Sequence, residues 1–106
     1  MINVTGGKLL LQGGRLEANT ERTDIIDISG SAGGHSIEGV LIKGVSTNAI
    51  HLAGTGDNSI VSHNNCPGGD IRIASGSTGN IVALNQVNAV VGSTTANQIG
   101  LNVTGV

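Results

Sequence analysis

The chain has 106 residues, a formal net charge of −2 and no basic run, so its size fits one small domain and nothing indicates nucleic-acid binding. It contains 18 Gly and no Phe, Trp or Tyr, so any core must be narrow and built from aliphatic side chains. No apolar stretch is long enough to span a membrane, the N-terminal residues show no signal-peptide pattern, and the single Cys66 excludes an intrachain disulfide.

The predicted elements are short aliphatic strands separated by turns rich in Gly, Asn and Ser. In chain order they are residues 16–19, 26–28, 40–45, 50–52, 61–66, 71–73, 82–87, 90–91 and 99–104. Their apolar residues alternate with period two, and Gly interrupts every window long enough for a helix. We therefore expect an all-β protein.

Two strand patterns recur in step along the chain. One reads Val-x-Leu-Asn-x-Val at residues 82–87, and its Asn position recurs with steps of 24, 21, 21 and 17 residues from Asn19 to Asn102, with Lys43 in the second copy. The other is an aliphatic pair around one polar residue, as in residues 26–28. A period near 21 residues with two or three short strands per repeat predicts a β-solenoid of about five coils, forming a single domain over residues 1–106. Leucine-rich repeats have similar periods, but their spaced leucines and helical segments are missing.

The recurring Asn predicts a ladder of side chains along the solenoid. Asn tolerates the left-handed conformation that a corner after a strand can require. Stacked corners lie about 4.8 Å apart, so their amides can hydrogen-bond from coil to coil. The predicted asparagine ladder consists of Asn19, Asn64, Asn85 and Asn102, with Lys43 interrupting it.

Strand alternation sorts the side chains into inner and outer sets. The predicted core is Val40, Ile42, Val61, Val82, Leu84, Ile99 and Leu101, and His63 and Cys66 are also expected inside. The outer face of the same strands carries the apolar Leu41, Ile60 and Ile81, which we expect to form an oligomer interface, because contiguous apolar patches mark contacts. The outer residues of the second strand pattern are polar: Asp27, His51 and Arg72.

Few residues are candidates for catalysis or metal binding. Asp27, His51 and Arg72 should stack on one outer face, where they are weak candidates for a lyase-like site; the alternative is a solvated charge ladder that stabilises neighbouring strands. Glycosidases need two carboxylates, and this row has one. His63 and Cys66 are too few to hold zinc. We therefore expect no catalytic site, no metal and no cofactor.

The repeated Val-x-Leu-Asn-x-Val units and the segment Gly13–Asn19 resemble the right-handed parallel β-helices of the pectate-lyase superfamily, and most of all bacteriophage tailspikes. The segment reads GGRLEAN, with Leu16 where tailspike coils commonly carry an aromatic residue. The resemblance extends over residues 6–104. It implies right-handed winding, a homotrimer, a place in the virion tail, and contact with bacterial surface polysaccharide through other parts of a longer parent protein.

These observations predict a structural, trimerising β-helix segment of a phage tailspike or adhesin, cut from a longer spike protein and involved in host-surface attachment. The alternative is a polysaccharide lyase or glycoside hydrolase of the same superfamily. A third possibility is a cell-surface or designed solenoid with no phage connection. The missing aromatic rings and carboxylate pair favour the structural role, so we expect no enzymatic activity from this chain alone and no insertion into a membrane.

Overall fold

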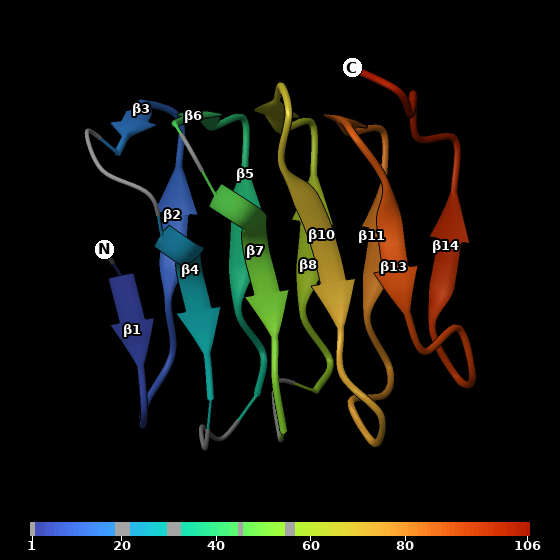
Figure 1. The fold of residues 1–106 in the computed structure, drawn as a ribbon. Helices are drawn as coiled ribbons and strands as arrows, with labels where there is room; N and C mark the ends of the chain where they lie inside the picture. Colours follow the sequence, from blue (N-terminus) through green and yellow to red (C-terminus); the bar gives the residue numbers. More distant parts are fainter. Residues whose placement is uncertain (1, 19–21, 30–32, 45, 55–56) are drawn as a thin grey trace.

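The computed structural model describes residues 2–18, 22–29, 33–44, 46–54 and 57–106, and shows a parallel β-solenoid (Figure 1). Sheet A contains β1 (Ile2–Val4), β4 (Arg22–Ile28), β7 (Ser46–Leu52), β10 (Asp70–Ile73) and β13 (Val90–Gly92). Sheet B contains β2 (Leu10–Gln12), β5 (Ser36–Glu38), β8 (Ile60–Ser62), β11 (Ile81–Ala83) and β14 (Gln98–Gly100). Sheet C contains β3 (Arg15–Glu17), β6 (Leu41–Lys43), β9 (Asn65–Cys66) and β12 (Gln86–Val87).

The described residues contain no helix, so the predicted all-β solenoid class is confirmed. Consequently, no helix in this part of the chain could cross a membrane. In Figure 1 the strands of sheet A run downward in front, those of sheet B run upward behind, and successive coils advance from the N-terminus toward the right. This is a right-handed winding, the hand that parallel crossovers adopt almost without exception.

The core is a set of aliphatic rows, each formed by equivalent residues of successive coils. Sheet B supplies Leu11, Ile37, Val61, Val82 and Ile99. Sheet C supplies Leu16, Ile42, Cys66 and Val87. Sheet A supplies Ile26, Ile50 and Ile71 in one row and Ile28, Leu52 and Ile73 in a second. Because these rows pack into one hydrophobic core, branched aliphatic side chains fill the interior without aromatic rings.

The coils differ in length mainly at one corner. From the inward residue of sheet B to that of sheet C the chain takes five residues in each coil, as from Val61 to Cys66. From sheet C to sheet A the distance shrinks toward the C-terminus. It is ten residues from Leu16 to Ile26, eight from Ile42 to Ile50, five from Cys66 to Ile71 and three from Val87 to Val90.

This variation makes one predicted register wrong. The sequence pattern aligns Val40 with Val61, whereas the structure pairs Ile37 with Val61. Val40 instead lies at the corner beside Asn64, and the backbone N–H of Asn65 donates to its carbonyl. The second coil has three more residues than the third at the corner between sheets C and A. The paired residues Ile37 and Val61 are therefore 24 residues apart, and the 21-residue spacing of Val61 and Val82 does not apply to them.

The corner after sheet B is formed by a left-handed residue, but this residue is not the Asn. His63, Leu84 and Leu101 have φ values of 56°, 61° and 54°. A left-handed residue reverses the alternation of a strand, so its own side chain faces outward and the following Asn faces inward. Leu84 and Leu101 are accordingly 47% and 83% exposed, and their prediction as core residues is wrong. His63 is exposed for the same reason, which also contradicts its predicted inward position.

Candidate functional site

A buried asparagine ladder runs through the corner between sheets B and C. The backbone N–H of Asn64 donates to Oδ1 of Asn85 at 3.0 Å, and that of Asn85 donates to Oδ1 of Asn102 at 3.0 Å. Each Nδ2 also donates to a backbone carbonyl, for example Asn85 to Val61 at 2.9 Å. The ladder reaches one coil further, since the N–H of Val40 donates to Oδ1 of Asn64 at 2.9 Å. These side chains therefore satisfy backbone groups that the bend turns inward.

Two residues predicted near this ladder stand apart from it. Lys43 lies in β6 opposite Glu17 of β3, so Val40 and not Lys43 occupies the ladder position in its coil. Lys43 is exposed, which a lysine at that inward position could not be. Asn19 lies outside the described residues.

A second ladder, which the sequence pattern did not predict, runs through the corner before sheet B. His35, Ser59, Asn80 and Asn97 occupy equivalent positions, each five residues before the first ladder's position. The N–H of Ser59 donates to Oδ1 of Asn80 at 2.9 Å, and that of Asn80 donates to Oδ1 of Asn97 at 3.0 Å. The N–H of His35 donates to Oγ of Ser59 at 3.2 Å. Sheet B is thus held between two rows of buried polar side chains.

His35 ends this second ladder as a hydrogen-bond acceptor. The N–H of Leu9 donates to its Nδ1 at 2.9 Å, and the side chain is 1% exposed. Nδ1 can accept this bond only while it carries no proton. Burial, followed by the positive charge of Lys8, lowers the pKa of His35 below its usual value of 6.5.

We expect the free energy of unfolding to decrease as pH falls from 7.5 to 5.5. The unfolded chain takes up a proton on His35 near pH 6.5, whereas the folded chain resists protonation until lower pH, so acidification favours unfolding in this window. Urea unfolding at both pH values measures this. His35→Asn, which keeps an acceptor of the ladder's own type, should lose most of the difference, and His63→Asn should keep it. An equal pH dependence in His35→Asn and the parent chain would contradict this role for His35.

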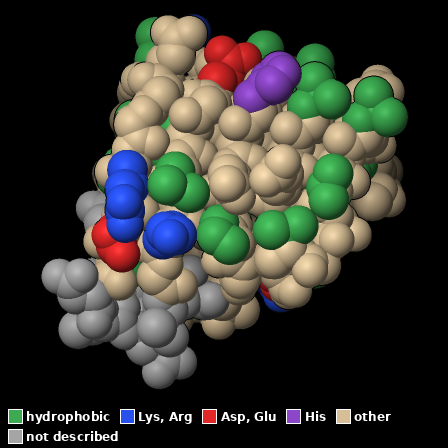
Figure 2. All heavy atoms as spheres, turned by 90° about the horizontal axis from the view of Figure 1, so that it is seen from above, with side chains coloured by type: hydrophobic (Ala, Val, Ile, Leu, Met, Phe, Trp, Pro, Cys, Tyr) green, Lys and Arg blue, Asp and Glu red, His purple; other side chains and the backbone are tan. Residues whose placement is uncertain are grey.

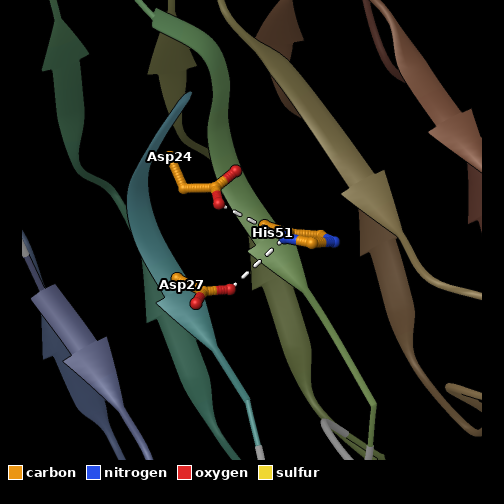
Figure 3. Close-up of side chains that lie close together, drawn as sticks. All are labelled: Asp24, Asp27 and His51. Atoms are coloured by element: carbon orange, nitrogen blue, oxygen red, sulfur yellow. Dashed lines mark ion pairs between the residues drawn. The ribbon is translucent and has the colours of Figure 1, made fainter. Parts of the chain in front are cut away.

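The outer face of sheet A carries the polar row predicted from the sequence. Asp27 pairs in register with His51, and His51 with Arg72. Figure 3 shows that the His51 ring lies between two carboxylates. Its Nδ1 is 3.3 Å from Oδ1 of Asp27 and 3.5 Å from Oδ2 of Asp24. Arg72 is exposed and belongs to none of the ion pairs found among the described residues.

Asp24 is the member of this cluster that sequence reasoning missed. Strict alternation would put residues three apart on opposite faces. However, Ile25 and Ile26 are both buried, so the alternation of β4 breaks between them and Asp24 reaches the same outer side as Asp27. Two consecutive isoleucines were the only sequence signal of this break.

The cluster lies on the open surface of a sheet. A surface pocket is lined by Gly79, Asn80, Ile81, Ala96, Asn97 and Gln98, none of which belongs to the cluster. Cys66 does not belong to the cluster either. It is a fully buried free thiol, and burial raises its pKa to about 12. With Cys66 in the core and His63 exposed, these two residues do not converge on a common ligand.

A third feature is an apolar outer strip. Ile60 and Ile81 are neighbours on the outer face of sheet B and are 42% and 44% exposed. The exposed Leu84 and Leu101 of the adjoining corner extend this strip toward the C-terminal coils. Leu41, predicted on the same face, is half-buried in sheet C, so that placement is wrong. The shifted register also brings Glu38 onto this face beside Ser62, whose Oγ donates to it at 3.0 Å.

Two basic side chains, Arg15 and Lys43, lie on sheet C, away from this strip. Figure 2 looks onto the side that carries sheet C and shows most of the visible Lys and Arg surface over the N-terminal coils. Arg15 there pairs with Glu17 at 2.7 Å. Hydrophobic side chains are spread over the remainder of this view. On this face the Lys and Arg side chains therefore lie mainly over the N-terminal coils.

Comparison with protein-family models, curated proteins and solved structures gives no match.

Proposed function

We propose that the chain is a structural, trimerising segment of a phage tailspike or related adhesin, with a β-helix of the pectate-lyase-like type. Its role is to hold a host-attachment spike rigid in the virion tail. Bacterial surface polysaccharide is contacted by other parts of the parent protein, because this chain has no aromatic ring on which a sugar could stack.

Two properties of the fold support a role as a rigid structural segment. Hydrogen bonds between coils run along three sheets and two buried polar ladders, so each coil is tied to the next at several points around its circumference. The Asp24, Asp27 and His51 cluster is separate from the surface pocket lined by Gly79–Ile81 and Ala96–Gln98. A spacer needs the first property, and a hydrolase would place its carboxylates in such a pocket.

The observation that carries the proposal is the contrast between two outer faces. Sheet B presents Ile60 and Ile81 side by side, whereas the equivalent row of sheet A is Asp27, His51 and Arg72. An apolar row that follows the direction of coil stacking suits two further copies of the chain around a threefold axis parallel to the solenoid. Each copy would then bury the same row, and the ring would close.

We expect the parent chain to be a trimer in solution and the double variant Ile60→Lys/Ile81→Lys to be a monomer. Each aliphatic side chain contributes roughly 1.5 to 3 kcal/mol when fully covered, and the entropy lost on association offsets part of this. Two lysines at the centre of the contact would remove that gain and add repulsion between copies. Light scattering coupled to size-exclusion chromatography measures the mass.

The matched control places two lysines on the outer face of sheet A, as Asn3→Lys/Val91→Lys, and should leave the mass unchanged. Circular dichroism of both variants shows whether the fold is retained. A parent chain that is already monomeric, or a folded Ile60→Lys/Ile81→Lys chain with the parent's mass, would refute this assembly.

A further inference from the structure

Three side chains on neighbouring strands of sheet A converge in a way that no ion pair fully accounts for. Asp24 and Asp27 come from β4 and His51 from β7, and one ligand atom from each lies within 4.8 Å of the other two (Figure 3). Oδ1 of Asp27 and Nδ1 of His51 are almost out of contact with solvent. Within the part of the chain that the structure describes, neither atom has a hydrogen-bond partner. Polar atoms that are hidden from solvent without a hydrogen bond are uncommon, and a bound cation would satisfy both of these.

The distances at His51 are those of two ligands that share an ion. Its Nδ1 lies 3.3 Å and 3.5 Å from the two carboxylates, longer than a charge-assisted hydrogen bond of about 2.8 Å. Two N or O ligands bound to zinc at about 2.0 to 2.2 Å and at the tetrahedral angle are separated by about 3.4 Å. The cluster therefore has room for a small cation between the ring nitrogen and the carboxylates.

Asn48 orients one of these carboxylates from behind. Its side chain is 3% exposed, and its Nδ2 donates to Oδ1 of Asp24 at 2.7 Å, which leaves Oδ2 turned toward His51. Buried partners of this kind fix the orientation of metal-ligating carboxylates. Asn48 and Asp24 are also paired in register between β7 and β4, so the sheet itself sets this arrangement.

The donor set selects the class of cation. Imidazole nitrogen suits zinc and other first-row transition metals, whereas calcium and magnesium prefer sites made of oxygen alone. Two carboxylates neutralise the charge of a divalent ion. Three protein ligands leave at least one coordination position open on the solvent side, which a water molecule can fill.

We propose that Asp24, Asp27 and His51 form a binding site for one divalent transition-metal ion of the zinc type, which links two neighbouring coils. The inference concerns sheet A alone and is independent of trimer formation through sheet B. It also replaces the expectation, drawn from the sequence, that the chain binds no metal.

The first test titrates the metal-free chain with Zn²⁺ by isothermal calorimetry and follows the melting temperature. We expect one Zn²⁺ per chain and a higher melting temperature with bound Zn²⁺, with binding at least tenfold tighter than that of Ca²⁺ or Mg²⁺. Asp27→Asn and His51→Gln should each weaken Zn²⁺ binding at least tenfold, because both keep the size of the side chain and remove a ligand. Asn48→Ala should weaken it less.

The matched controls are Asp70→Asn and His63→Gln, which change the same residue types outside the cluster and should bind Zn²⁺ as the parent chain does. A second measurement covers any variant that fails to fold. Mn²⁺ added to the parent chain should broaden the backbone NMR signals of β4 and β7 before those of sheets B and C. Lack of Zn²⁺ binding, unchanged affinity in Asp27→Asn or His51→Gln, or equal affinity for Ca²⁺ would each overturn the proposal.

Discussion

Val82→Asp is expected to abolish folding. Val82 is fully buried in β11, where it stacks between Val61 and Ile99 of the neighbouring coils. An unpaired carboxylate at this depth carries a desolvation penalty of several kcal/mol, comparable with the 5 to 15 kcal/mol that stabilise a typical domain. Within the described residues, the buried rows around Val82 are aliphatic and offer no cation to pair with it. Far-ultraviolet circular dichroism and the yield of soluble protein measure the outcome.

The same substitution at Gln86 is the matched control. Gln86 lies four residues further along, is exposed on the outer face of β12, and should accept Asp with little effect on stability. If Val82→Asp is soluble and melts at the temperature of the parent chain, the inward row of sheet B has been assigned to the wrong residues.

Asn85→Leu is expected to lower the free energy of unfolding by about 1.5 to 4.5 kcal/mol. The substitution fits an aliphatic side chain into an aliphatic interior, so loss of packing is not the reason. It removes the acceptor of the buried Asn64 N–H, which loses this partner, and one donor to the Val61 carbonyl. The loss at the N–H costs about 1 to 3 kcal/mol, and the lost hydrogen bond to the carbonyl adds about half as much. Urea unfolding measures the difference.

The control for the ladder is Asn65→Leu. Asn65 is exposed in β9, so an identical change there tests the effect of the residue type without the buried hydrogen bonds. We expect a change within about 0.5 kcal/mol, as for most surface positions. Equal losses in Asn85→Leu and Asn65→Leu would show that the ladder contributes nothing specific.

The sequence predicts the solenoid because sheet A repeats its pattern faithfully. The aliphatic pairs at residues 26–28, 50–52 and 71–73 lie in consecutive strands, in the register that their spacing implies. The register of sheet B is harder to predict for one physical reason. Lys43 occurs 21 residues before Asn64 and thus imitates a ladder residue, while the strand that truly pairs with Val61 contains one aliphatic residue, Ile37, between Ser36 and Glu38.

The candidate site shows the same limit. Alternation brings Asp27, His51 and Arg72 together because it holds over the second half of each strand in sheet A. It misses Asp24 because a local bend overrides it at Ile25 and Ile26. A repeat defined by one residue type does not reveal the second ladder. His35, Ser59 and Asn80 have the same hydrogen-bonding role in it, but their side chains differ.

The corner between sheets C and A has a consequence for how such a protein can change. Its length varies from coil to coil while the five-residue step between sheets B and C stays constant, so most insertions and deletions are absorbed at this corner. The two corners that flank sheet B are tied from coil to coil by the buried polar ladders. The corner between sheets C and A has no such ladder among the described residues, so additional residues can be accommodated there. The connection between Cys66 and Ile71 is short. A peptide grafted there should be displayed on the side of the solenoid without altering the register of the neighbouring coils.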